Sequence, residues 1–114
     1  MMYRQGDILL IPVPFTDLSS SKRRPVLVIS NNLYNSPSDD MVVVAITSNL
    51  ASKSHSILIK SDSLLEGVLK VDSNIRTDKI YTLSQNIVMK KFGTVKEDVL
   101  YDVIVEIGKL IKRG

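Results

Sequence analysis

Short apolar runs separated by polar turn residues fill most of the chain before Thr94, and they predict β-strands. Asp7–Val13 is rich in aliphatic residues, and its prolines predict that it ends at a sheet edge or a bulge. Pro25–Ser30 is apolar on both sides, which is typical of a central strand, and Met41–Ile46 is similar. Ser56–Lys60 is a further strand that places Ile57 and Ile59 on one face.

The weaker patterns predict shorter elements. Three further strands are expected, at Val68–Val71, Asn74–Arg76 and Ile87–Phe92. A short helical turn is expected over Ser61–Glu66. Turn-forming residues predict connections at Thr16–Lys22, Asn31–Asp40 and Ser48–Ser54.

The last fifth of the chain has the pattern of an amphipathic helix instead. Thr94 is followed three residues later by Glu97, which predicts a capping box at the start of that helix. Apolar residues then recur at helical spacing: Val99, Leu100, Val103, Ile104, Ile107, Leu110 and Ile111. We therefore expect a mainly β fold, a strongly bent antiparallel sheet or partly open barrel, closed by a C-terminal helix.

Composition restricts the chemistry that such a fold can perform. A length of 114 residues predicts a single domain over residues 1–114. The absence of cysteine excludes a disulfide framework and a thiol nucleophile, and one histidine excludes a multi-histidine metal site within one chain. Neither a signal peptide nor a membrane-spanning run is recognisable, so we expect a cytoplasmic protein without membrane attachment.

The net charge is +3, which is compatible with a polyanionic partner. Basic and acidic residues from Thr94 to Gly114 cancel, so the excess lies on the preceding β region. Its densest point is Lys22-Arg23-Arg24-Pro25, at the entrance to a predicted strand. Arginine there can bind phosphate bidentately, and Pro25 restricts the backbone beside Arg24. The alternative is a solvated charge run that deters edge pairing.

Other polar segments are weaker candidates. Thr47-Ser48-Asn49 follows an apolar strand, so its hydroxyls and amide can donate to a phosphate oxygen, although an ordinary strand-to-turn transition has the same composition. Ser73–Lys79 contains Arg76 and Asp78, which fit a structural ion pair. His55 is either a general base or a surface residue. Phe15 is the aromatic residue best placed to stack on a base.

In their order along the chain, these segments resemble the MazF/PemK toxin family. The resemblance rests on Gly6-Asp7, Arg24-Pro25, Ile46-Thr47-Ser48, Ile75–Lys79 and the C-terminal helix, and it extends from Gly6 to Ile111. It implies an SH3-like, partly open barrel that forms a homodimer. It also implies a sequence-specific endoribonuclease of a type II toxin–antitoxin pair, which cleaves single-stranded mRNA without a metal or cofactor and is bound by a cognate antitoxin.

By position, the resemblance assigns the catalytic roles to Arg24 and Thr47. Arginine and threonine can stabilise the charge that develops on the phosphorane oxygens when a ribose 2′-hydroxyl attacks the neighbouring phosphorus. The expected substrate-binding residues are Phe15, Asp17, Lys22, Arg23, Ser48, Asn49, Lys53 and Arg76.

The segment before Arg24-Pro25 departs from the family pattern. Many members carry a Gly-Ser-Glu-Gln-type segment there, whereas this chain has the shorter Thr16–Lys22 without glutamate. The segment Pro14–Leu18 (Pro-Phe-Thr-Asp-Leu) resembles a sub-branch less clearly tied to RNA cleavage. Asp17 substitutes for the missing carboxylate only if the loop folds back. A non-catalytic module that binds nucleic acid or protein therefore remains an alternative, as does a toxin that acts on a protein, as in the related CcdB family.

Overall fold

The computed structural model describes residues 2–12, 22–51 and 54–114. Its strands are β1 (Asp7–Pro12), β2 (Arg23–Val28), β3 (Asp40–Thr47), β4 (Ser56–Ile59), β5 (Leu64–Gly67), β6 (Ser73–Ser84) and β7 (Lys90–Val95). Its helices are α1 (Asn32–Asn35) and α2 (Glu97–Ile111), with 3-10 turns at Ser61–Ser63 and Gln85–Ile87.

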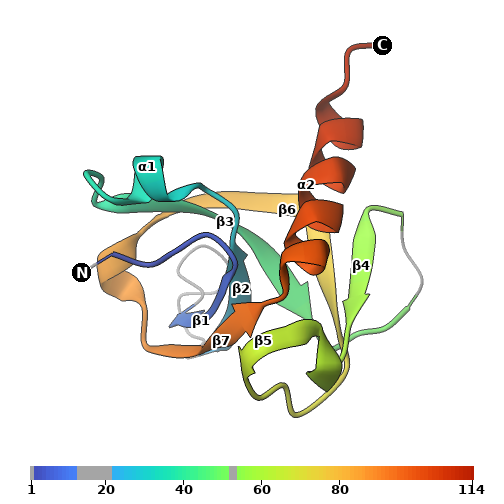
Figure 1. The fold of residues 1–114 in the computed structure, drawn as a ribbon, viewed down its shortest axis with the longest axis horizontal. Coiled ribbons are helices and arrows are strands. Elements are labelled where there is room, and N and C mark those ends of the chain that lie inside the picture. The colour runs from blue at the N-terminus through green and yellow to red at the C-terminus, as the bar shows by residue number, and fades with distance from the viewer. Residues whose placement is uncertain (1, 13–21, 52–53) are drawn as a thin grey trace.

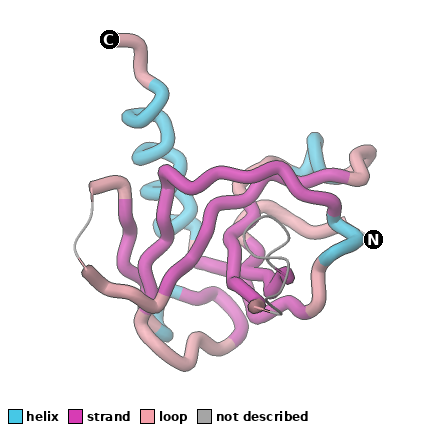
Figure 2. Tube along the Cα trace, turned by 180° about the vertical axis from the view of Figure 1, so that it is seen from behind, coloured by secondary structure: helices cyan, strands magenta, loops and turns pink. Residues whose placement is uncertain are grey.

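The described strands form one antiparallel sheet of seven strands in the order β4-β6-β3-β2-β1-β7-β5. The sheet curls into a half-barrel, and α2 lies against β4 and β6 before its C-terminal end projects from the body (Figure 1). Seen from behind, the long strands cross the molecule as one bent surface (Figure 2). The expected mainly β, partly open barrel with a C-terminal helix is confirmed.

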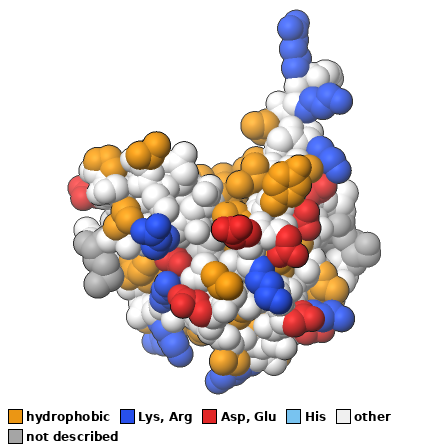
Figure 3. All heavy atoms as spheres, viewed as in Figure 1, with side chains coloured by type: hydrophobic (Ala, Val, Ile, Leu, Met, Phe, Trp, Pro, Cys, Tyr) orange, Lys and Arg blue, Asp and Glu red, His pale blue; other side chains and the backbone are white. Residues whose placement is uncertain are grey.

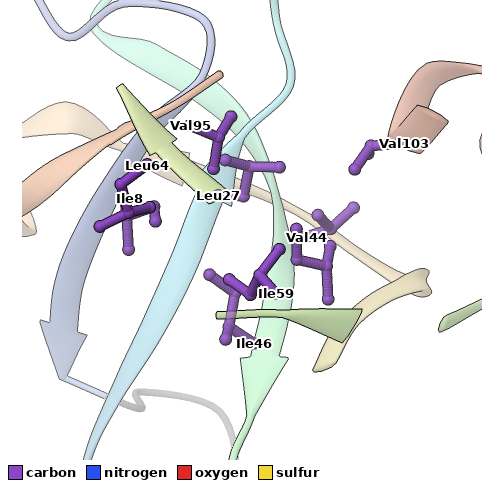
Figure 4. Packing of buried hydrophobic residues seen from close by; sticks show 9 residues of the cluster. Ile8, Leu27, Val44, Ile46, Ile59, Leu64, Val95 and Val103 are labelled. Carbon is purple, nitrogen blue, oxygen red and sulfur yellow. The ribbon is translucent and has the colours of Figure 1, made fainter. Parts of the chain in front are cut away.

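The two faces of the central strands carry separate apolar clusters. Ile8, Leu27 and Val44 are buried on one face, where Val103 of α2 points toward the sheet (Figure 4). Leu9, Ile11, Val26, Val28, Met41 and Val43 are buried on the other face. Because successive side chains of a strand alternate between faces, burial on both faces requires the continuous apolar runs seen in the sequence.

Strand β1 is not at an edge, contrary to the expectation from its prolines, because it lies between β2 and β7. Pro12 is tolerated as its last residue, since β7 pairs with Asp7–Leu10 and leaves Pro12 without a partner on that side. The expected bulge lies elsewhere in the strand, as a register shift between Ile8 and Leu9. The predicted strand end at Val13, and Pro14 after it, lie outside the described residues.

Strand β6 is much longer than the predicted Asn74–Arg76 segment. It pairs with β3 on both sides of a register shift, since Ala45 pairs with Arg76 whereas Val44 pairs with Ile80. The intervening polar residues gave the sequence the character of a turn. The predicted strand at Val68–Val71 is wrong: the strand in this region is Leu64–Gly67, and Val68 and Val71 are exposed in the following loop.

The predicted capping box is also wrong. Helix α2 begins at Glu97 with Lys96 as its N-cap, and Thr94 lies within β7. The Thr94 hydroxyl donates to Asp7 Oδ1 at 3.0 Å and is therefore engaged in the sheet. The predicted connection Asn31–Asp40 contains α1, whose N-cap Asn31 accepts from the backbone N–H of Tyr34. The turn expected over Ser61–Glu66 is confirmed as the shorter 3-10 turn Ser61–Ser63.

In the described part of the chain, no helix is both long and apolar enough to cross a membrane.

Candidate functional site

Adjacent strands bring the two candidate catalytic residues to one end of the sheet. The pairing of β2 with β3 ends at Val26 and Ala45, and Arg24 and Thr47 each lie two residues beyond that pair, at the same end of the sheet. Arg24 pairs with Ile11 of β1 on its other side, which holds its backbone within the sheet.

The residues after β3 are held by local hydrogen bonds. The Thr47 hydroxyl accepts from the backbone N–H of Asn49 at 3.1 Å, and Asn49 Oδ1 accepts from the N–H of Ala51 at 3.0 Å. The side-chain amide of Asn74 donates to the Asn49 carbonyl at 3.3 Å. Because the Thr47 oxygen is the acceptor in its bond, its own proton is available to a second acceptor, such as a phosphate oxygen.

A cavity of about 670 Å³ opens beside this strand end. This volume falls within the usual range for small-molecule sites. Four segments supply most of its lining: residues 23–25, 46–48, 67–71 and 90–92, together with Ile8 and Ser73. Arg24 and Thr47 therefore border one cavity, although they come from different strands.

The lining is strongly basic. It contains Arg23, Arg24, Lys70, Lys90 and Lys91, and the described residues contribute no carboxylate to it. Space filling shows Lys and Arg side chains along the lower edge of the molecule (Figure 3). Within the part of the chain that the structure describes, only Lys91 of these five forms an ion pair. Four of the five lining cations therefore have no carboxylate partner among the described residues, which favours an anionic ligand.

Lys91 is held by two carboxylates, Asp7 and Glu66, each 3.3 Å from its ammonium group. Burial lowers the pKa of Lys91, but the hydrogen bonds and charges of Asp7 and Glu66 outweigh burial, so the pKa is raised above its ordinary value. Lys91 consequently stays protonated at neutral pH, while its charge is largely balanced by its partners.

The structure brings several of the predicted binding residues to this region. Arg23 and Ser48 line the cavity, Asn49 is exposed next to Ser48, and Lys22 is exposed just before Arg23. Arg76 does not line it and instead donates two hydrogen bonds to Asp78, at 3.1 and 3.0 Å. Phe15, Asp17 and Lys53 lie outside the described residues.

His55 lies outside the described cavity lining. Its backbone has a φ of 63°, and its carbonyl accepts from the N–H and hydroxyl of Thr77 at 2.9 and 2.6 Å. Its side chain is half-buried. Among the described residues, no three His, Cys, Asp or Glu side chains gather as metal ligands.

Sequence reasoning missed Lys70, Lys90, Lys91 and Phe92. They belong to parts of the chain that only the curvature of the sheet brings to β2 and β3. One local signal was present: Lys90-Lys91-Phe92 joins two cations to an aromatic residue, a combination suited to phosphates and bases.

Comparisons with known proteins agree with this geometry. The sequence model of the PemK-like, MazF-like toxins of type II toxin–antitoxin systems matches residues 4–111. None of the curated proteins matches the chain.

Solved structures share the fold at low sequence identity. An endoribonuclease in complex with its cognate antitoxin, from a mycobacterial species, has a TM-score of 0.78 and 17% identity, with 98% of this chain and 97% of that chain covered. MazF in a MazE–MazF crystal structure from Deinococcus radiodurans has a TM-score of 0.80 and 20% identity, with both chains fully covered. The Mycobacterium tuberculosis toxin MazF-mt6 has a TM-score of 0.75 and 16% identity, with 95% of this chain and 98% of that chain covered.

Proposed function

Because this chain belongs to the PemK-like, MazF-like family of type II toxin–antitoxin toxins, we propose that it is an endoribonuclease that cleaves single-stranded RNA. The observation that carries the proposal is the convergence of Arg24 and Thr47 on one basic cavity. RNA supplies both a phosphate for the cations and unpaired bases for the apolar part of the lining.

The proposed reaction is an internal transesterification. The ribose 2′-hydroxyl forms a bond to the adjacent phosphorus, the bond from phosphorus to the 5′-oxygen breaks, and the products are a 2′,3′-cyclic phosphate and a 5′-hydroxyl. The 2′-hydroxyl gives up a proton and the 5′-oxygen gains one, so the step consumes no water and no co-reactant.

Arg24 stabilises the negative charge on the phosphorane oxygens, and Thr47 donates a further hydrogen bond to them. Arginine stays protonated near neutral pH, so charge stabilisation suits Arg24 better than a role as general base. Lys22 and Arg23 hold neighbouring phosphates, and Ser48 and Asn49 line the path of the strand. Phe15, Asp17 and Lys53 are further predicted substrate contacts, whereas Arg76 lies outside the cavity lining and is paired with Asp78.

The same proposal includes protein partners. A cognate antitoxin covers the RNA site, and the toxin is a homodimer in the cytoplasm. The structural neighbours support the antitoxin, since they include an endoribonuclease in complex with its cognate antitoxin and a MazE–MazF crystal structure. We also retain two expectations from the sequence, a single domain and membership of the Pro-Phe-Thr-Asp-Leu sub-branch.

The deciding experiment is a cleavage assay with a long single-stranded RNA in EDTA. Wild-type protein is compared with Arg24→Ala and Thr47→Ala, and Lys112→Ala, at the far end of α2, is the matched control. Loss of a preorganised donor typically slows such a step by about 100- to 1,000-fold. We therefore expect the cleavage rate to fall by about this factor in Arg24→Ala and by a smaller factor in Thr47→Ala. Product ends should be cyclic phosphate and 5′-hydroxyl. Equal cleavage by wild type and Arg24→Ala would contradict the proposal.

One observation favours a second candidate, a non-catalytic RNA-binding module. The cavity has no carboxylate among its described lining residues, so no side chain there is suited to accept the 2′-hydroxyl proton. RNA binding that weakens with salt, without strand scission by wild-type protein, would identify this function instead.

A further inference from the structure

The cavity extends well beyond Arg24 and Thr47. A second part of its lining comes from residues 67–71, between β5 and β6, and from residues 90–92 at the start of β7. The segment between β5 and β6 lies at the lower edge of the molecule, near the end of β3 (Figure 1). None of these residues belongs to the set that the sequence assigned to the site.

Phe92 gives this second part an aromatic surface. The ring is half-buried, packs against the apolar cluster that contains Ile8, and also lines the cavity. The ammonium of Lys90 lies 5.3 Å from the ring centroid. Lysine is long and Lys90 is exposed, so its ammonium can leave the ring for a phosphate while a base stacks in its place.

Lys70 and Lys90 add positive charge at the same place. Both are exposed and line the cavity, and neither has a carboxylate partner among the residues that the structure describes. Lys91, between Lys90 and Phe92 in sequence, is instead paired with Asp7 and Glu66. The second part therefore joins one aromatic ring to two uncompensated cations.

Amide and carboxylate side chains are absent from the described lining of this part of the site. Asparagine and glutamine read adenine, aspartate and glutamate read cytosine, and the described lining of the cavity contains none of these four residue types. Stacking on an aromatic ring accepts any base, because every base has a flat π-face. Lysine ammonium groups bind phosphate without regard to sequence.

We propose that Lys70, Lys90 and Phe92 form a sequence-tolerant subsite for one unpaired nucleotide that flanks the cleaved phosphate. The base stacks on Phe92, and Lys70 and Lys90 bind the phosphates on either side. This inference rests on the proposed function, since it takes RNA as the ligand. In this proposal, Lys70, Lys90 and Phe92 contribute binding affinity for RNA. Other residues of the site select the sequence that is cleaved.

The test measures equilibrium binding of fluorescent twelve-nucleotide oligouridine, oligocytidine and oligoadenosine by anisotropy, over a series of salt concentrations. Variants are Phe92→Leu, which keeps an apolar side chain of similar size, and Lys70→Gln and Lys90→Gln. Tyr34→Leu and Lys112→Gln are the matched controls, because both positions are exposed and outside the cavity lining. Circular dichroism and thermal unfolding establish that each variant is folded.

We expect Phe92→Leu to weaken binding by about 5- to 150-fold, to a similar extent for the three oligonucleotides. Lys70→Gln and Lys90→Gln should each reduce the slope of log K against log salt by about 0.7. The cut positions in a long RNA should stay the same in all three variants.

The subsite would be overturned if the three variants are folded and keep the wild-type affinity and salt slope. A changed pattern of cut positions in any of them would also overturn it. Binding is measured independently of cleavage, so the two proposals fail separately. If the wild-type protein does not cleave RNA, the proposed nuclease activity is refuted, but the binding comparison can still be made. If the wild-type protein cleaves RNA and the variants bind it as tightly as the wild type does, only the subsite is refuted.

Discussion

Asp7 shows how one residue connects the chain start, the sheet and the cavity. It is buried, its Oδ2 accepts from the backbone N–H of Arg4 at 2.9 Å, and its Oδ1 accepts from the Thr94 hydroxyl at 3.0 Å. The same Oδ1 lies 3.3 Å from the ammonium of Lys91. A buried carboxylate needs several such donors, so Asp7 joins the start of the chain to β7, two segments that are distant in sequence. The sequence pattern predicts Thr94 as a helix cap, whereas in the structure its hydroxyl binds Asp7.

At the same scale, Arg76 and Asp78 provide a test with a pH dependence. The hydrogen bond from Arg76 lowers the pKa of Asp78, against desolvation, which raises it. Because the pKa of Asp78 is lower in the folded state than in the unfolded state, the pair stabilises the fold at pH values above the unfolded-state pKa. This stabilisation is lost as the pH falls through the folded-state pKa.

We therefore expect Asp78→Asn to lower the free energy of unfolding by about 0.5 kcal/mol or less at pH 7, as for other exposed pairs. This difference from wild type should be smaller at pH 2 than at pH 7, because the lowered pKa of Asp78 means that the contribution is lost as the carboxylate is protonated. Urea unfolding at the two pH values measures it, with the exposed Asp72→Asn as the control. A difference of the same size at both pH values would show that the ion pair is not its cause.

Among the elements, β5 and β7 pair through two glycines. Gly67 has a φ of 94° and pairs with Gly93, and a Cβ on Gly93 would overlap the carbonyl oxygen of Glu66. This close approach also positions the cavity wall, because Gly67 begins one lining segment and Gly93 follows the other. The backbone contact explains why neither position can carry a side chain without moving a strand.

We expect Gly93→Ala to lower the free energy of unfolding by roughly 1–3 kcal/mol, as overpacking does in well-packed regions. Gly108 in α2 is the matched control, since an added Cβ there meets no atom within 4 Å. Gly108→Ala should raise stability by about 0.5–1 kcal/mol, because alanine favours the helix. Thermal and urea unfolding of both variants give the comparison, and a neutral Gly93→Ala would show that the β5–β7 contact relaxes freely.

For the whole molecule, α2 presents more apolar surface than its own sheet covers. Val103 is its only buried residue, whereas Tyr101, Ile104 and Ile111 are 68%, 46% and 73% exposed. Orange side chains gather over the lower half of this helix in the space-filling view (Figure 3). Such a surface supports the proposed homodimer.

A charge placed on this surface should separate the subunits. We expect Ile104→Glu to convert a dimer into a monomer at micromolar concentration, because a carboxylate cannot be buried there without a partner. Light scattering gives the mass directly, and Lys112→Glu on the exposed end of the chain is the control. A monomeric wild-type protein would contradict the homodimer itself.

The sequence by itself determined the type of the main elements and the approximate position of the central strands, β2 and β3. Continuous apolar runs at Pro25–Ser30 and Met41–Ile46 require burial on both faces, and the helical spacing after Val99 requires one apolar stripe; these are local regularities. The segments that contain Arg24 and Thr47 could be recognised as candidate sites, because cations and hydroxyl groups lie next to these apolar runs.

Only the tertiary structure decided which distant residues meet. The bend of β6, the glycine contact between β5 and β7, and the placement of Lys70, Lys90 and Phe92 beside Arg24 depend on strand register and sheet curvature. Those are set by packing among segments far apart in the chain, and no short window of sequence contains them. The ends of the central strands could therefore be predicted, whereas the wall that completes the cavity could not.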